Sequence, residues 1–181
     1  MKNKWNADRL VSLSAIGISF FTLIIFIYQT NLLSRQNYIS IMPYLAISTT
    51  HNAAKHVFEL NLKNHGVGPA IIESVMLDYK GKRYNLVDYE NEIHKFLASI
   101  SPELSKLKNI SHGTLGRGMA IPANSTYNVL GVRQSPEDYE LMTGTLDELL
   151  TNGLKFQIIY KSIQDERWLI NNDSEGPRKL K

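Results

Sequence analysis

Residues 59–82 read ELNLKNHGVGPAIIESVMLDYKGK and carry the clearest structural signal in the chain. Just before and within this stretch, Phe58, Leu60 and Leu62 are apolar, and the residues between them are polar. In the next run, residues 71–79, one face is expected to consist of Ile71, Glu73, Val75, Leu77 and Tyr79. Alternation with a period of two is typical of strands that bury one face. The stretch therefore predicts two strands joined by a tight turn.

The connection between these two runs contains Asn64, Gly66, Gly68 and Pro69. Gly and Asn tolerate a positive φ, and Pro fixes the backbone where the next strand begins. These residues need no ligand to explain them, so the pattern favours a structural turn over a binding loop.

Further alternating runs lie on both sides of this stretch, and a Lys80-Gly81-Lys82 turn follows it. They cover residues 45–48, 83–87, 127–130, 154–160 and 166–170. Seven short strands, most with one apolar and one polar face, indicate antiparallel sheets. The fold class expected is mainly β, with an immunoglobulin-like antiparallel β-sandwich over residues 43–171.

Two or three helical insertions are expected between the strands. Residues 93–100 have helical spacing after Asp88, which is a candidate cap. Ser135 precedes Pro136 and two acids, which is typical of a helix start. Residues 145–148 form a capping box, and Gly153 could end that helix. Residues 172–181 have few large apolar side chains and are expected to form a disordered tail.

A long apolar run precedes the strands. Residues 10–28 read LVSLSAIGISFFTLIIFIY, and the next charged residue is Arg35. Nineteen helical residues span roughly 28 Å, close to the hydrocarbon thickness of a bilayer. A buried soluble helix is a weaker alternative, and a cleaved signal peptide would need small residues at its cleavage site. The run predicts a transmembrane helix over 10–29, followed by a stalk over 30–42.

Basic residues predict the orientation of this span. The N-terminal tail, residues 1–9, contains Lys2, Lys4 and Arg9, whereas only Arg35 follows the span closely. The positive-inside rule therefore places the tail in the cytoplasm and the domain outside, although short tails can also translocate. The chain is expected to cross its membrane once.

Small residues form a stripe along the predicted span: Ser12, Ala15, Ser19 and Thr22. Such stripes allow close packing of two helices in lipid and predict a homo-oligomer. The alternative is that single spans simply tolerate these residues.

Composition excludes several classes of function. The 181 residues include five His and no Cys, which excludes disulfides, thiolate zinc sites and thiol catalysis. From residue 31 onward there are 17 Lys and Arg against 16 Asp and Glu, so a nucleic-acid partner is not expected. We find no catalytic or metal-binding motif and expect neither a cofactor nor an enzyme, although dispersed residues of a hydrolase could still converge.

A glycine-rich segment, residues 113–118, follows two lysines. Lys106, Lys108 and Arg117 form a candidate anion-binding loop with it, because backbone N–H groups of such loops can bind phosphate. The segment lacks the Gly-Lys-Ser/Thr of a P-loop, so a mobile surface loop is the favoured interpretation.

The stretch at 59–82 resembles the Asn-x-Gly strand-turn-strand of bacterial immunoglobulin-like adhesion and accessory domains. The whole layout is similar to a group of functionally unassigned bacterial single-span proteins. These share an N-terminal span, a strand start like Pro43-Tyr44-Leu45, and an Asn-x-Gly-x-Gly-Pro-Ala motif. The resemblance implies a sandwich and a location in a bacterial plasma (inner) membrane. It brings no catalytic or ligand residues with it.

These observations lead to two main functional hypotheses. The first is a membrane-anchored, non-enzymatic module that binds a protein or an envelope component. The alternative is a small membrane effector or sensor of a stress or phage-defence system. In that case a cytoplasmic β domain would bind a ligand through residues 106–118.

Overall fold

The computed structural model describes residues 7–180, so Lys2, Lys4 and Trp5 lie outside the described residues. The chain divides into two compact units. The first ends at Ser40 and the second begins at Ile41.

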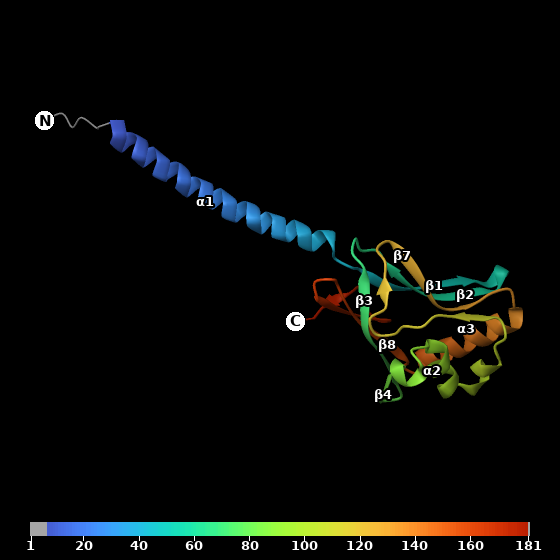
Figure 1. Cartoon of the computed structure of the whole chain (residues 1–181). Helices are drawn as coiled ribbons and strands as arrows, with labels where there is room; N and C mark the ends of the chain where they lie inside the picture. The colour runs from blue at the N-terminus through green and yellow to red at the C-terminus, as the bar shows by residue number, and fades with distance from the viewer. Residues whose placement is uncertain (1–6, 181) are drawn as a thin grey trace. The chain divides into compact units, whose positions relative to one another are not determined.

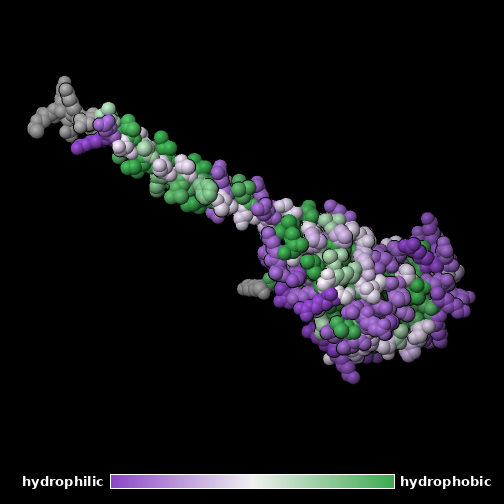
Figure 2. Space-filling model, viewed as in Figure 1, coloured by the Kyte–Doolittle hydropathy of each residue, from purple (hydrophilic) through white to green (hydrophobic). Residues whose placement is uncertain are grey.

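The first unit is one helix, α1 (Ala7–Ser40), of 34 residues. It is long and apolar enough to cross a membrane, and Figure 2 shows its largely hydrophobic surface. The helix continues through most of the predicted stalk. No Gly or Pro interrupts residues 18–40, and Pro43 disfavours helical geometry at the residue before it.

The second unit begins with a four-stranded antiparallel sheet, here called sheet A (Figure 1). In spatial order it contains β1 (Leu45–Asn52), β2 (Val57–Asn64), β7 (Ser125–Val132) and β5 (Ile110–His112). Strand β1 therefore forms one edge of the sheet and the three-residue β5 forms the other. A short helix, η1 (Ala53–Lys55), joins β1 to β2.

The six strands of sheet B are also antiparallel. In spatial order they are β10 (Arg178–Lys179), β9 (Arg167–Asn171), β8 (Lys155–Lys161), β3 (Ala70–Tyr79) and β4 (Lys82–Asn85), while β6 (Ala120–Ile121) also pairs with β3. The predicted β3–β4 turn is confirmed, with positive φ at Lys80 and Gly81. Strands β2 and β3 do not pair with each other. The turn between them carries the chain from one sheet to the other.

The inner faces of the two sheets share one hydrophobic core. Leu62 and Val129 of sheet A and Phe156 and Ile158 of sheet B line the same small internal void. The predicted antiparallel β-sandwich is thereby confirmed.

A buried tyrosine ties the two sheets together. The side chain of Tyr160 is fully buried, stacks on Trp168, and accepts a hydrogen bond of 3.2 Å from the backbone N–H of Leu45. Burial raises the pKa of Tyr160 to about 12, so its hydroxyl remains neutral and can accept this bond.

Apart from η1, the helical segments of this unit lie together on one side of the sandwich (Figure 1). They are η2 (Leu86–Tyr89), α2 (Ile93–Ile100), η3 (Pro102–Lys106) and α3 (Pro136–Thr151). The predicted cap at Ser135 is confirmed, because its hydroxyl accepts a hydrogen bond of 3.2 Å from the N–H of Asp138.

Two other predicted helix starts are wrong. The cap of α2 is Glu92 and not Asp88, because η2 and two positive-φ residues, Glu90 and Asn91, intervene. The capping box at 145–148 lies in the middle of α3. Buried Met142 and Leu146 continue one apolar face across it, so a single helix covers the whole segment.

The prediction of a disordered tail over 172–181 is also wrong in part. Residues Arg178 and Lys179 pair with Leu169 and Trp168 of β9, and the N–H of Leu180 donates to the carbonyl of Arg167 at 2.8 Å. A sheet edge provides backbone partners whatever the side chains are, so this short strand needed no apolar pattern.

Candidate functional site

The predicted structural turn holds the segment that follows α1. Asn64 is 1% exposed, and its Oδ1 accepts from the N–H of Tyr44 at 3.1 Å and from that of Gly66 at 3.0 Å. Its Nδ2 donates to the carbonyls of Gly68, Ile121 and Pro122, at 2.8, 3.1 and 3.1 Å. One amide side chain therefore joins three segments.

The sequence had suggested that the two glycines supply a positive φ. The structure shows instead that they are needed because two backbone segments approach each other closely. A Cβ on Gly66 would lie 2.4 Å from the carbonyl oxygen of Met42, and one on Gly68 would lie 1.9 Å from that of Ile41. Neither glycine is among the positive-φ residues. Two backbone segments touch here, so no side chain fits between them.

We call this arrangement the clasp: Asn64, Gly66 and Gly68 holding Ile41–Tyr44. Backbone bonds reinforce it, because the N–H of His65 donates to the carbonyl of Tyr44 at 2.8 Å. Pro69 follows and leads into β3. The clasp fixes where the chain enters the sandwich and sets the start of β1.

The clasp also determines which backbone groups of β1 are free. Tyr44 hydrogen-bonds toward β2, and in an antiparallel pair the bonded residues alternate. Ser48, opposite Asn61, therefore faces β2. The N–H and C=O groups of Ile47, Thr49 and His51 point away from it. Within the described residues, β1 pairs with β2 alone, so these groups form an open edge.

This edge has none of the features that normally prevent strand pairing. Its eight residues, LAISTTHN, contain no Lys, Arg, Asp, Glu or Pro. Charges, prolines and bulges usually protect the edges of natural sheets. An uncharged strand of this length is therefore competent to accept another strand.

A groove of about 400 Å³ runs beside the edge. The residues that form its apolar part are Leu45, Ile47, Leu60, Leu146, Leu150, Phe156 and Ile170. Asn171, Asn172, Ser174 and Glu175 form a polar side, and the buried Oδ1 of Asn171 has no hydrogen-bond partner among the described residues. The outward backbone groups of β1 and the apolar floor of the groove thus lie side by side.

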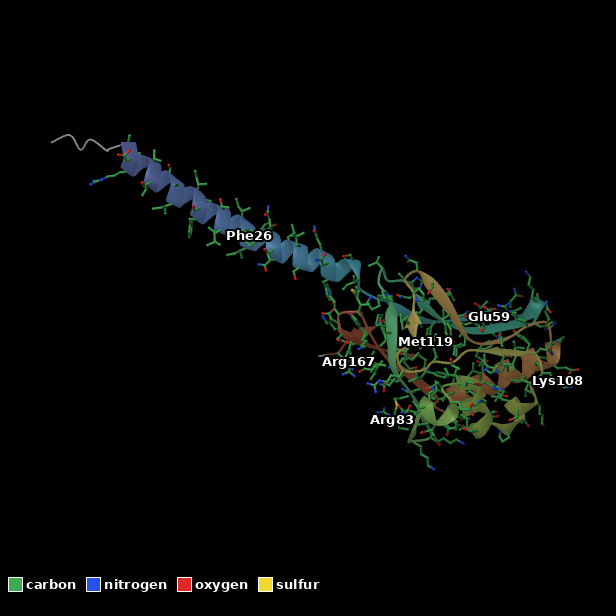
Figure 3. The ribbon with its side chains drawn as sticks, viewed as in Figure 1. Phe26, Glu59, Arg83, Lys108, Met119 and Arg167 are labelled. Carbon is green, nitrogen blue, oxygen red and sulfur yellow. The ribbon has the colours of Figure 1, made fainter. Side chains whose placement is uncertain are left out.

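The three residues predicted to bind an anion do not converge. Lys108 and Arg117 line separate hollows, and Lys106 lines neither. Figure 3 shows Lys108 far from Met119, which lies two residues beyond Arg117. The predicted single anion-binding loop is therefore not assembled.

The segment 113–118 is also not a mobile surface loop. Leu115 is 2% exposed, and its N–H donates to the carbonyl of Asn91 at 2.8 Å. The N–H of Gly118 donates to the carbonyl of Ile72 at 2.8 Å. The buried leucine anchors the segment between α2 and β3.

The small-residue stripe of α1 lies on a regular helix. The hydroxyls of Ser12 and Thr22 each donate to a carbonyl four residues earlier, Asp8 and Ile18, at 2.8 Å. These donors are used within the helix, so any association through Ser12, Ala15, Ser19 and Thr22 would depend mainly on close packing. Self-association stays a prediction.

Two histidines and a glutamate come together at the start of α2, where His112 of β5 joins Glu92 and His94. The Nδ1 of His112 lies 3.0 Å from the Oε2 of Glu92, and the ring of His94 stacks on that of His112. No group of three residues able to hold a metal ion is found among residues 7–180. Glu92 and His94 are two residues apart, but sequence spacing gave no sign that His112 would join them, because His112 belongs to β5.

A buried carboxylate, Asp138, holds the turn before β5. It is 7% exposed and accepts from the N–H and the side-chain Nδ2 of Asn109, at 2.9 and 3.0 Å. Burial raises its pKa, but hydrogen bonds from Asn109, Lys108 and Ser135 outweigh burial and lower the pKa below its ordinary value.

We expect Asp138→Asn to lower the free energy of unfolding at pH 7 by about 1–2 kcal/mol, because it replaces an ionised acceptor. A lowered folded-state pKa gives stability that is present above the unfolded value of 3.8 and is lost as the pH falls through the folded value. The difference in the free energy of unfolding between the parent and Asp138→Asn should therefore become smaller as the pH is lowered from 5 to 3. Denaturant unfolding at several pH values measures it.

The matched control is Asp173→Asn, which alters an exposed pair with Lys155. That variant should change stability by less than about 0.5 kcal/mol. Equal effects of the two variants, or a pH-independent effect of Asp138→Asn, would contradict the role given to Asp138.

Comparisons of the sequence with family models and with curated proteins give no match to either. The functional proposal therefore rests on the geometry of the domain.

Proposed function

We propose that this protein is a membrane-anchored, non-enzymatic binding module that captures an extended segment of a partner protein. Helix α1 crosses a bacterial plasma membrane once, with the domain outside. The basic residues before the span, compared with Arg35 alone after it, support this orientation. The free edge of β1 is the binding element.

One observation carries this proposal: an uncharged edge strand lies directly beside an apolar groove. A strand added to β1 would satisfy the outward N–H and C=O groups of Ile47, Thr49 and His51. Strand addition obtains affinity from backbone hydrogen bonds and specificity from pockets that receive alternate side chains. Both parts of that recognition mode are present here.

The chemistry of the groove defines the partner segment. Its floor is apolar, so every second side chain of the added strand should be apolar. Glu175 is the one charged residue among the described residues that line the groove. The partner segment is therefore extended, with apolar side chains on one face and no acidic residue toward Glu175.

The alternative, a cytoplasmic sensor with an anion site at 106–118, has weaker support. It requires Lys106, Lys108 and Arg117 to act on one ligand, and they are dispersed over different parts of the domain.

Two proline variants test which backbone groups of β1 are free. Thr49→Pro removes an outward N–H and should lower the free energy of unfolding by less than about 1 kcal/mol, since edge strands tolerate Pro there. Ser48→Pro removes an N–H that faces β2 and should cost about 3 kcal/mol. Thermal unfolding of the full chain in detergent measures both. The opposite order would contradict the assignment of the free edge.

Binding is tested with a photo-crosslinking amino acid at Leu150, which lies in the groove wall and is partly exposed. In cells, an adduct should form in the parent and with Thr49→Val, which keeps the backbone donor. It should be lost with Thr49→Pro, which cannot pair. An adduct of equal yield with Thr49→Pro, or no adduct in any background, would overturn the proposal.

A further inference from the structure

The outward face of sheet A carries a connected row of polar side chains that runs toward the edge opposite β1. Asn128 Nδ2 donates to Asn61 Oδ1 at 3.0 Å, and Asn61 Nδ2 donates to Glu59 at 3.3 Å. The Ser111 hydroxyl lies 3.3 Å from Asn128 Oδ1. This row crosses β2, β7 and β5.

An irregularity in strand pairing builds this row. Leu60 pairs with Leu130 and Asn61 pairs with Asn128, so Val129 is an extra residue in β7. Such bulges re-aim side chains and are frequent beside functional sites. Here the bulge brings Asn128 next to Asn61 while Val129 stays in the core.

A polar hollow of about 440 Å³ opens at the β5 side of the row. The hollow depends on the absence of a side chain at Gly131, because a Cβ there would lie 2.8 Å from the Ser111 hydroxyl. Lys108 and Arg133 are its charged lining residues, and no carboxylate of the described residues lines it. The hollow therefore presents two cations with hydroxyl and amide groups between them.

Two carboxylates, those of Asp138 and Glu59, hold the two cationic residues of the hollow in place. Asp138 holds the backbone of Lys108 and Asn109. Glu59 accepts from the Nε of Arg133 at 2.8 Å and also from its Nη2, so among the described residues Nη1 has no hydrogen-bond partner. The hydrogen bond from Arg133 lowers the pKa of Glu59, so this orienting pair is ionised at neutral pH.

We propose that this polar hollow binds a phosphate group, with Lys108 and the Nη1 of Arg133 contacting its oxygens. Charge-assisted bonds from Lys and Arg are the usual means of phosphate recognition. The phosphate belongs either to a soluble phosphate compound or to a lipid headgroup. The site is independent of the β1 edge and goes beyond the proposed function.

The first experiment titrates inorganic phosphate into the full chain, held in nanodiscs of phosphatidylcholine, at low ionic strength. Calorimetry should show saturable binding to the parent. Lys108→Ala and Arg133→Ala should each weaken it about tenfold, the equivalent of one charge-assisted hydrogen bond. Lys106→Ala is the matched control, because Lys106 lies two residues away and does not line the hollow. It should bind as the parent does.

Gly131→Ala is a second variant that fills the hollow without changing any charge. It should also weaken phosphate binding. In a Trp5→Phe background, the fluorescence of Trp168, which is buried in the core, reports whether each variant is folded.

The second arm measures co-flotation of the same nanodiscs with phosphatidylglycerol vesicles. The site is assigned to a lipid headgroup if flotation depends on Lys108 and Arg133 but not on Lys106, and if inorganic phosphate does not bind. The reverse result assigns it to a soluble phosphate compound. Equal losses with Lys106→Ala and Lys108→Ala, or no binding in either arm, would overturn the proposal.

Discussion

Replacing Gly68 with Ala is expected to lower the free energy of unfolding of the domain by about 3 kcal/mol or more. The new Cβ would lie 1.9 Å from the carbonyl oxygen of Ile41, a backbone atom that cannot rotate away. Relief requires the Ile41–Tyr44 segment to move, which breaks the bonds between Tyr44 and the clasp. The melting temperature should fall by about 10 °C.

The measurement uses denaturant unfolding of the full chain in detergent. A Trp5→Phe background leaves Trp168, buried in the core, as the remaining one of the two tryptophans. Gly144→Ala is the control, since Gly144 lies within α3 and a Cβ added there would have nothing within 4 Å. That change should stabilise the helix by up to about 1 kcal/mol. Equal stability of Gly68→Ala and the parent would refute the close contact.

Replacing Asn64 with Ala is the second change for which a large effect is expected, about 3–4 kcal/mol. The amide serves two N–H donors and three carbonyl acceptors, in a place that is almost fully buried. Water cannot reach most of these groups to replace it. Buried polar groups left without a partner lose their full hydration free energy.

Two further variants make this prediction specific. Asn64→Asp keeps the acceptor oxygen but places a carboxylate against three carbonyls, so its stability should rise as the pH is lowered and the carboxyl becomes protonated. Asn85→Ala removes a single exposed bond to the N–H of Val87 and should cost less than about 1 kcal/mol. Urea titrations at pH 7 and pH 4 compare the three. A loss at Asn64→Ala no larger than that at Asn85→Ala would disprove the clasp.

Most of the sandwich could be predicted because its long strands are patterned. Every second side chain is apolar and buried in β2 from Phe58 to Leu62, in β8 from Phe156 to Tyr160, and in β3 from Val75 to Tyr79, beyond the irregularity at Ile72–Ser74. The structure places each of these strands close to its expected range. Strands β5, β6 and β10 have two or three residues. A period of two cannot be recognised over so short a run, and backbone pairing with a neighbouring strand is what forms them.

The candidate sites were less predictable, since their parts are brought together by pairing. The groove beside β1 combines β1, β9 and the end of α3, which are separated by about a hundred residues of chain. The polar hollow combines Lys108 with Arg133, whereas the sequence had grouped Lys108 with Arg117 because they are near in the chain. Proximity in sequence was a poor guide to which cations share a surface.

By itself the sequence determined an apolar helix at the N-terminus, a mainly β domain after it, and a special connection at residues 64–69. Local patterns carry such information, because helical and strand periodicity follow from the side chains of one segment. Only the tertiary structure decided that this connection crosses between two sheets and that its glycines admit the backbone of Ile41–Tyr44. It also decided that β1 is an open edge. Close approach and edge position are relations between distant segments, and no single segment encodes them.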